Sequence, residues 1–194
     1  MKIERIRHVF PGDHIPEKGF KCYGIVEGRA VIIGTLCKVE DLYFIMAKTK
    51  IYVPKQYDVV IGRVVYASQD YYKVDLGSCT GILPALSFAN ATKRNRPELE
   101  KENTVLCQVE RVSDGDALLS CKKEGLGAID ECFPIESWKI RLLYFNNVLQ
   151  KLSKNRSFRI ALAINGFVWI DADAETKREV LREIERYGTE NENA

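Results

Sequence analysis

The middle of the chain constrains the fold most, because clusters of turn residues divide it into short apolar runs. Glycine, serine and aspartate gather at residues 68–70, 77–81 and 113–116, and β-branched or aromatic residues dominate the runs between them. This alternation is typical of β-strands joined by tight turns. The predicted strands cover residues 57–67, 71–76, 82–86, 104–112 and 117–121.

A long polar and basic connection, residues 90–101, separates the third of these five predicted strands from the fourth. Five strands in that layout are typical of a small closed Greek-key barrel of the OB type. We therefore predict an OB-fold barrel over residues 54–123. Closure leaves no free sheet edge, and such barrels bind extended ligands on one face and its loops.

Residues 1–53 indicate a small N-terminal β domain, because glycines separate short apolar runs there. The strands predicted in this segment cover residues 21–26, 30–34, 42–46 and 50–53.

The hydrophobic period changes in residues 124–194, which indicate an α+β domain. Apolar residues recur there at steps of four and three, as on one stripe of a helix: Trp138, Leu142, Phe145, Leu149 and Leu152. Two strands, 158–163 and 167–170, precede a helix that Asp173 caps. The apolar face of that last helix is Val180, Leu181, Ile184 and Tyr187. The predicted fold class is multi-domain, mainly β plus α+β.

The composition excludes several classes of protein. Apolar residues make up 46% and charged residues 29% of the 194 residues, which argues against wholesale disorder. A net charge of +2 excludes a polycation held on nucleic acid by bulk charge, but it allows a locally basic face. The longest uncharged stretch, 76–92, is broken by glycines and a proline, so we expect no membrane segment and no export signal.

Metal and catalytic motifs are sparse. The six cysteines form no C-x-x-C pair and the only histidines are His8 and His14, so we predict buried reduced thiols, no metal site and no cofactor. No phosphate-binding glycine loop of the P-loop type is present. The aspartate pairs 114/116 and 171/173 suit a hairpin turn and a helix start, and we predict a protein that is not an enzyme. The enzymatic alternative is a hydrolase that uses these aspartates with a metal ion.

Polyanion binding has better support in the sequence. Lys93, Arg94 and Arg96 place three cations within four positions of the predicted barrel loop, where they can bind phosphates. Tyr71 and Tyr72 lie on the second predicted strand, so one of them can stack on a base while the other faces the core. Lys122 and Lys123 are weaker candidates for the same role. A merely solvated basic surface is the alternative.

The dipeptide Asn165-Gly166 lies between two apolar strands, which is the strongest short signal for a β-hairpin. A glycine loop pressed against a nucleic-acid backbone, as in KH modules, is the competing interpretation.

Several segments together resemble a known family, the RNA-binding cap subunits of the eukaryotic RNA exosome. They are residues 9–15 (VFPGDHI), 52–54 (YVP) with 58–62 (DVVIG), 72–77 (YKVDLG), Phe88 with 91–97 (ATKRNRP), and Asn165-Gly166 followed by Trp169. The segment 91–97 is the most specific, and the likeness covers nearly the whole chain.

The resemblance implies an N-terminal β domain, an S1-type barrel and a KH-like domain. It further implies a protein without catalytic activity that sits with two other cap subunits on a six-membered ring of RNase PH-like proteins. Such a subunit stabilises the ring and helps to admit single-stranded RNA for 3′-to-5′ degradation and processing, including ribosomal RNA maturation. The implied location is the nucleus, with the nucleolus, and the cytoplasm, without a membrane association.

The sequence departs from the family at two positions. Ala163 replaces the first glycine of the family's G-x-N-G signature, and the resemblance implies that Asn165, Gly166 and Trp169 are chiefly structural. Pro84 stands where many S1-type domains have a histidine, which weakens the transfer of a full set of RNA contacts. Two alternatives stay open: the basic loop docks a ring subunit instead of RNA, or the chain is a free-standing translation or ribosome-associated S1-type factor.

Overall fold

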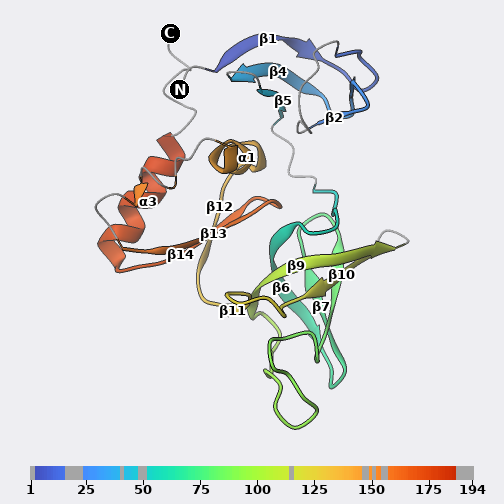
Figure 1. Cartoon of the computed structure of the whole chain (residues 1–194), viewed down its shortest axis with the longest axis vertical. Helices are drawn as coiled ribbons and strands as arrows, with labels where there is room; N and C mark the ends of the chain where they lie inside the picture. The colour runs from blue at the N-terminus through green and yellow to red at the C-terminus, as the bar shows by residue number, and fades with distance from the viewer. Residues whose placement is uncertain are drawn as a thin grey trace. The chain divides into compact units, whose positions relative to one another are not determined.

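The computed structural model describes residues 3–15, 24–39, 42–47, 52–113, 116–145, 149, 152–153 and 157–186. The chain divides into two compact units (Figure 1). The first contains residues 1–49, 141–156 and 173–194, and the second contains residues 50–140 and 157–172. Within the described residues, no helix is long and apolar enough to span a membrane.

The N-terminal part of the first unit is a small β structure. Its main sheet is antiparallel, in the order β1-β4-β5, with β1 at Glu4–Val9, β4 at Gly34–Val39 and β5 at Leu42–Met46. The short strands β2 (Ile25–Val26) and β3 (Arg29–Ala30) form a separate ladder. The core of this part consists of Val9, Ile15, Ala30, Leu36, Ile45 and Ala47.

The β prediction for the N-terminal segment is confirmed, but two of its strands are wrong. The predicted strand 30–34 is interrupted, because Val31 and Ile33 are exposed and the chain leaves β3 at Ala30 before β4 begins. Tyr52 and Val53 do not form a strand, since the backbone of Tyr52 bonds to the Ser78 hydroxyl instead of a neighbouring strand. Predicted strand residues 21–23 and 50–51 lie outside the described residues.

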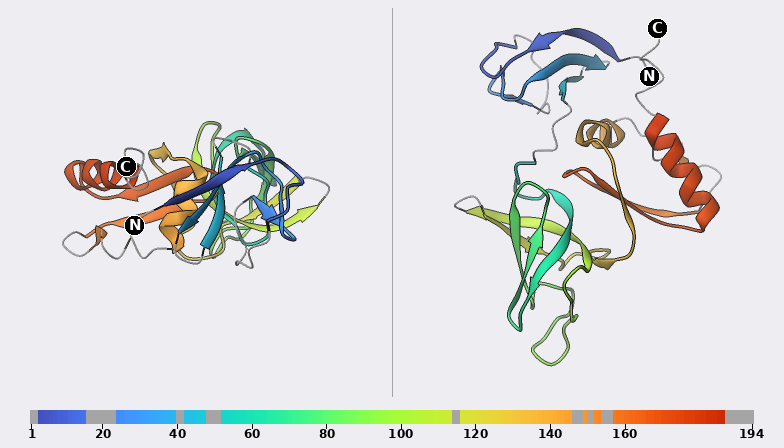
Figure 2. Two further views of the ribbon diagram at one scale, coloured as in Figure 1. Left: turned by 90° about the horizontal axis from the view of Figure 1, so that it is seen from above. Right: turned by 180° about the vertical axis from the view of Figure 1, so that it is seen from behind.

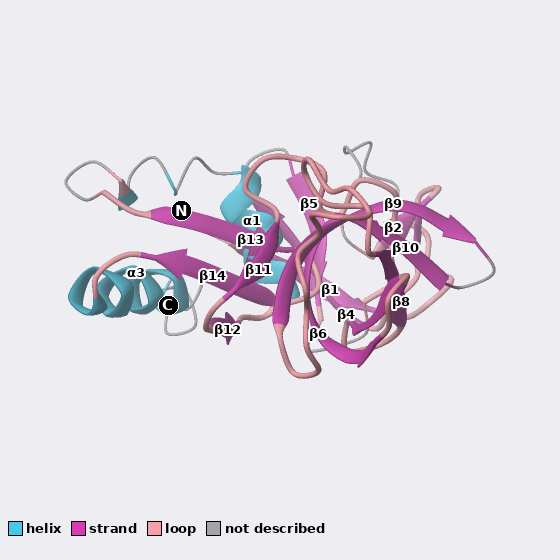
Figure 3. Ribbon diagram, turned by 90° about the horizontal axis from the view of Figure 1, so that it is seen from below, coloured by secondary structure: helices cyan, strands magenta, loops and turns pink. Residues whose placement is uncertain are grey.

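The second unit contains the predicted five-stranded barrel, which is confirmed. The strands are β6 (Val59–Ala67), β7 (Tyr71–Asp75), β8 (Thr80–Pro84), β9 (Thr104–Ser113) and β10 (Asp116–Ser120). They pair in the order β10-β8-β7-β6-β9, and an additional β9–β10 pairing closes the barrel. Only the β8–β10 pairing among these is parallel. Figure 3 shows β6, β8, β9 and β10 lying together.

Buried and exposed residues alternate along the barrel strands, so that one face of each strand can form the core of the closed barrel. On β7, Tyr72 and Val74 are buried while Lys73 and Asp75 are exposed, so one face of the strand forms the barrel core. Gly62 on β6 permits tight packing, because a Cβ atom there would lie 2.5 Å from the Val74 Cγ1 atom.

A second, KH-like sheet has the order β12-β14-β13, with β12 at Cys132–Pro134, β13 at Arg159–Ala163 and β14 at Phe167–Asp171. Between the barrel and β12, the short strand β11 (Gly127–Ile129) pairs with β9. The strands β13 and β14 were predicted, whereas the three-residue strands β11 and β12 were not. The α+β class of this segment is confirmed. The boundaries 1–53, 54–123 and 124–194 stay a prediction.

The helices of this segment whose bounds the structure describes are α1 (Ser137–Phe145) and α3 (Ala174–Arg186). Asp173 caps α3 as predicted, because its Oδ1 atom accepts hydrogen bonds from the Glu175 and Thr176 amides at 3.0 Å. The Thr176 side chain and amide lower the pKa of the Asp173 carboxyl. The cap therefore stabilises the helix at neutral pH and is lost as the pH falls through that lowered pKa.

The structure describes only some of the residues that were predicted to form the apolar faces of the helices. Trp138 and Leu152 are buried, as are Val180 and Ile184 on α3. The side chains of Leu142 and Phe145 and the whole of Tyr187 lie outside the described structure.

Candidate nucleic-acid interface

One end of the barrel collects most of the residues predicted to bind RNA. This end contains the turn between β6 and β7, residues 68–70. It also contains the C-terminal ends of β8 and β10, because β8 runs antiparallel to β7 and β10 runs parallel to β8. The connection 85–103 leaves and returns at the same end, where β9 begins. A parallel bridge between Phe88 and Cys121 ties the connection to the residues after β10, next to Lys122 and Lys123. In Figure 2 the connection projects from the barrel.

The basic loop, residues 92–97, has an ordered backbone. The Thr92 amide donates to the Asn95 carbonyl at 2.8 Å, and the Asn95 amide donates to the Thr92 hydroxyl at 3.1 Å. Lys93 and Arg94, which lie between these two residues, are exposed. The turn thus presents two adjacent cations to solvent from a fixed backbone.

Arg96 behaves differently from the other two cations. It is partly buried, and its guanidinium donates a hydrogen bond to the Gln69 carbonyl in the β6–β7 turn. This contact holds the basic loop against the barrel. A guanidinium has five N–H donors, so Arg96 keeps donors for an additional acceptor.

The structure separates the two predicted tyrosines. Tyr72 is 3% exposed, and its hydroxyl donates to the Pro97 carbonyl at 2.9 Å. The same hydroxyl accepts a hydrogen bond from the Leu99 amide at 3.4 Å, and the ring packs edge-on against Phe88. Tyr72 is therefore a core residue that anchors the connection, and the stacking hypothesis applies to Tyr71 alone.

Tyr71 lies on the outer face of the barrel, where it contacts an aromatic residue that the sequence analysis missed. Its ring centroid is 5.9 Å from that of Tyr66, which is 49% exposed, and the rings are tilted by 39°. The Lys73 ammonium lies 5.9 Å from the centre of the Tyr66 ring. The sequence signal for Tyr66 is weak, because a bulge between Val64 and Tyr66 breaks the alternation of β6.

Asn165 joins the KH-like sheet to the barrel. Its Oδ1 atom accepts a hydrogen bond from the Ile61 amide at 3.1 Å, and its Nδ2 atom donates to the Ile61 carbonyl at 2.7 Å and the Leu76 carbonyl at 3.2 Å. The side chain is buried, so these groups bond to backbone instead of water. This geometry favours a structural role for the Asn165-Gly166 hairpin.

Gly166 and Trp169 belong to the same structural region. Gly166 has φ +98°, and its carbonyl accepts a hydrogen bond from the Ile135 amide at 2.9 Å. The indole of Trp169 donates to an Asp130 carboxylate oxygen, and the Arg159 guanidinium lies 5.7 Å from its ring centre.

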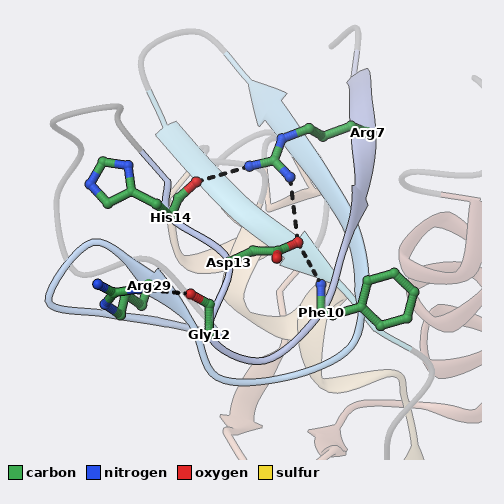
Figure 4. Close-up of polar contacts among 6 residues, drawn as sticks. All are labelled: Arg7, Phe10, Gly12, Asp13, His14 and Arg29. Carbon is green, nitrogen blue, oxygen red and sulfur yellow. Dashed lines mark hydrogen bonds and ion pairs between the residues drawn. The ribbon is translucent and has the colours of Figure 1, made fainter.

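The segment VFPGDHI folds into a braced turn in the N-terminal unit (Figure 4). The Asp13 carboxylate accepts a hydrogen bond from the Phe10 amide at 3.0 Å and pairs with Arg7 at 3.5 Å. Arg7 also donates to the His14 carbonyl at 2.9 Å, and Arg29 donates to the Gly12 carbonyl at 3.0 Å. The charged groups of this segment therefore serve the local fold.

Two of the four candidate catalytic aspartates have structural partners. Arg159 pairs with the carboxylate of Asp171, and Asp173 caps α3; Asp114 lies outside the described residues. His8 Nδ1 lies 3.3 Å from the Thr35 hydroxyl. Over the part of the chain that the structure describes, no group of three or more histidine, cysteine, aspartate or glutamate side chains is arranged to hold a metal ion.

The described cysteines are free thiols: Cys37, Cys79, Cys107, Cys121 and Cys132. Burial raises the pKa of Cys37 to about 11. A hydrogen bond with Cys121, together with burial, raises the pKa of Cys107. These two thiols are therefore protonated at neutral pH, which makes them poor nucleophiles.

Comparison with known families gives two matches that follow each other along the chain. Residues 52–128 match the S1 domain of the exosome complex component RRP40, and residues 132–176 match the KH domain.

Individual relatives carry the same description. A Dictyostelium discoideum protein described as exosome complex component rrp40 is 31% identical over 185 residues, which cover 84% of this chain and 78% of the relative. The Schizosaccharomyces pombe exosome complex component rrp40 is 26% identical, with 87% of this chain and 82% of the relative covered. The human component RRP40 is 31% identical over 74% of this chain and 56% of its own length.

The solved structures include one with the same fold. A crystal structure described as an exosome complex RNA-binding protein superposes with a TM-score of 0.53 at 22% identity, covering 71% of this chain and 98% of the other.

Proposed function

Because the chain belongs to the RRP40 family of exosome complex components, we propose that it is a non-catalytic, RNA-binding cap subunit of an RNA exosome. In this role it binds RNase PH-like ring subunits and other cap subunits, and it stabilises the ring. It helps to admit single-stranded RNA for 3′-to-5′ processing and degradation, including ribosomal RNA maturation. The proposed location is the nucleus, with the nucleolus, and the cytoplasm.

The observation that carries the RNA-binding part is the gathering of cations at one barrel end, together with the exposed Tyr66 ring and the half-buried Tyr71 ring. Lys93 and Arg94 are exposed on a fixed turn, and Arg96 attaches that turn to the strand pair bearing Tyr66 and Tyr71. A groove that tracks phosphates with cations and stacks bases on aromatics is how OB-type barrels bind single strands.

Binding of a short single-stranded RNA to the full chain at several salt concentrations tests this proposal. We expect weak binding that falls as salt rises, and Arg94→Ala and Arg96→Ala should each reduce the logarithmic salt slope by about 0.7, which corresponds to one lost phosphate contact. Arg111→Ala is the matched control, because Arg111 is exposed on β9 toward the opposite end of the barrel. It should leave affinity and slope unchanged.

The alternative target of the basic loop is a ring subunit. In that case Arg94→Ala and Arg96→Ala would leave RNA affinity and slope unchanged but would reduce the recovery of RNase PH-like subunits with the chain. Mass spectrometry of the intact native assembly identifies these subunits directly. Recovery of ribosomal proteins instead would favour the translation-factor alternative, which the descriptions of the relatives do not favour.

The roles of two of the four aspartates considered for metal binding support the non-catalytic part of the proposal. Asp171 is paired with Arg159 and Asp173 caps a helix. We expect the isolated chain to release no nucleotides from RNA in the presence of magnesium or manganese ions. Cleavage that is abolished both by chelation and by Asp171→Asn would contradict the proposal.

A further inference from the structure

Cys107 and Cys121 form a buried pair of thiols between the neighbouring strands β9 and β10. Their sulfur atoms lie 3.4 Å apart, although the two residues are 14 positions apart in the chain. Both residues are completely buried, and both are free thiols. We call these two residues the barrel dithiol.

The strand register places the two cysteines directly opposite each other. Ser120 pairs with Gln108 in the antiparallel ladder, so the next pair along the ladder is Cys121 with Cys107. The Cα atoms of opposite residues in such a ladder lie about 4.5–5.5 Å apart, which is within the range that a disulfide requires. The two sulfur atoms can therefore approach to bonding distance by side-chain rotation, while the backbone keeps its register.

Packing of the barrel does not require sulfur at these two positions. Two residues earlier in the same ladder, Leu119 lies opposite Val109 and fills the core with hydrocarbon alone. The Cys121 thiol donates weak hydrogen bonds to the Cys107 sulfur and to the Leu106 carbonyl, each at 3.4 Å. The hydrogen bond with Cys121, together with burial, raises the pKa of Cys107, so the pair rests in its reduced form.

Cys121 also links the dithiol to the connection that carries the basic loop. Its amide donates to the Ser87 carbonyl at 2.7 Å, and it forms a parallel bridge with Phe88. Cys121 directly follows β10, whereas Cys107 lies inside the ten-residue strand β9. Because strand ends open more readily than strand interiors, local opening exposes Cys121 before Cys107.

We propose that the barrel dithiol is a site of reversible oxidation, at which hydrogen peroxide converts the two thiols into an intrachain disulfide that locks β9 to β10. The Cys121 sulfur attacks one peroxide oxygen, the O–O bond breaks, and a sulfenic acid and one water form. The Cys107 sulfur then attacks the Cys121 sulfur, and the leaving hydroxyl takes the Cys107 proton to form a second water. Two thiols are oxidised and the peroxide is reduced to two waters. A dithiol reductant restores both thiols by exchange.

Trypsin makes the proposed bond directly detectable, because it cleaves after Arg111, between the two cysteines. Peptides 102–111 and 112–122 then contain one of the two cysteines each. The folded full chain is treated with hydrogen peroxide, its remaining thiols are alkylated, and it is digested without reductant. We expect mass spectrometry to find these peptides joined, two hydrogen atoms lighter than their sum, and separated by dithiothreitol. A non-reducing gel should show a monomer, which places the bond within one chain.

The disulfide should also stabilise the barrel. A cross-link that closes a loop of about 15 residues should raise the melting temperature by about 6–12 °C. Cys121→Ala should abolish both the joined peptides and this rise. Cys132→Ala is the matched control, because it removes a half-buried thiol outside the pair and should leave both results unchanged. The wild-type peptide map tests the inference even if Cys121→Ala does not fold.

Three results would overturn this inference. The first is peroxide treatment that oxidises the half-buried Cys79 and Cys132 while Cys107 and Cys121 stay free for alkylation after unfolding. The second is joined peptides that form only in the urea-unfolded chain, because the fold would then not bring the thiols together. The third is a disulfide that leaves the melting temperature unchanged, because it would not lock β9 to β10. The inference does not depend on RNA binding, so its failure leaves the proposed function standing.

Discussion

The Asn165-Gly166 hairpin and the basic loop both carry residue types that RNA-binding proteins use, yet the structure gives them opposite environments. Asn165 is 7% exposed, and both polar atoms of its amide bond to backbone groups of the barrel. Lys93 and Arg94 are exposed on a turn whose hydrogen bonds are made by Thr92 and Asn95.

This difference shows that burial, not residue type, separates a structural motif from a ligand site. A buried polar side chain must be satisfied within the protein, so its removal costs folding free energy. An exposed cation on a preformed backbone contributes little to folding and remains available for a phosphate. Stability and RNA affinity should therefore respond to mutation independently in the two regions.

The largest effect is expected for Asn165→Ala. The substitution leaves the Ile61 amide and two carbonyls without their buried partner, which should lower the free energy of unfolding by about 3 kcal/mol. Denaturant unfolding of the full chain measures the loss, and faster amide hydrogen exchange at Ile61 locates it.

The control for this variant is Asn95→Ala, the same change at an exposed position of the basic loop. It should alter stability by less than about 0.5 kcal/mol. If Asn165→Ala kept full stability while weakening RNA binding, the hairpin would be a ligand site and the comparison would fail.

Gly166→Ala should have the next largest effect. The backbone at φ +98° is strained for any residue with a Cβ atom, and that atom would lie 3.1 Å from the Ile135 carbonyl oxygen. We expect a loss of about 2 kcal/mol in unfolding free energy without a change in RNA affinity. Gly125→Ala is an informative reference, because it combines a positive φ with open space around the new Cβ atom. A smaller loss for Gly166→Ala than for Gly125→Ala would contradict the role of the close contact.

A smaller effect is expected for Tyr72→Phe, which tests the junction between the core and the basic loop. The change removes the hydroxyl that donates to the Pro97 carbonyl, and should cost about 1 kcal/mol. Tyr71→Phe should be neutral, because the structure gives Tyr71 a ring contact on the outer face instead of a buried hydroxyl bond. If denaturant unfolding showed equal losses of unfolding free energy for the two variants, the assignment of Tyr72 to the core and Tyr71 to the outer face would be wrong.

The strands of the barrel were predictable because the sequence signals that mark them are local. Turn residues mark the ends of its strands, and alternation along β7 separates Tyr72 and Val74 from the outer face. In contrast, β1 contains a single buried residue, Val9, so its strand character depends on pairing with β4 and leaves little periodic signal. The three-residue strands β11 and β12 likewise depend on partners elsewhere in the chain.

The candidate site was predictable in its residues but not in their environments. The sequence identified Asn165, although its partner Ile61 is 104 positions away and no local pattern connects them. It placed Tyr71 and Tyr72 on one strand, and the pleat then made one of them a core residue. Tyr66 escaped prediction because a bulge, which is set by pairing with β7, turns it outward.

The smallest effect on stability is expected for Lys93→Ala. This variant gives the clearest test of the difference between the basic loop and the Asn165-Gly166 hairpin. Because Lys93 is exposed on a turn held by hydrogen bonds between Thr92 and Asn95, its loss should change the free energy of unfolding by less than about 0.5 kcal/mol. The logarithmic salt slope for single-stranded RNA should nevertheless fall by about 0.7. Asn165→Ala should give the reverse, a large loss of stability with an unchanged slope in the molecules that remain folded. If both variants moved stability and slope together, the two regions would form one coupled unit and burial would not distinguish them.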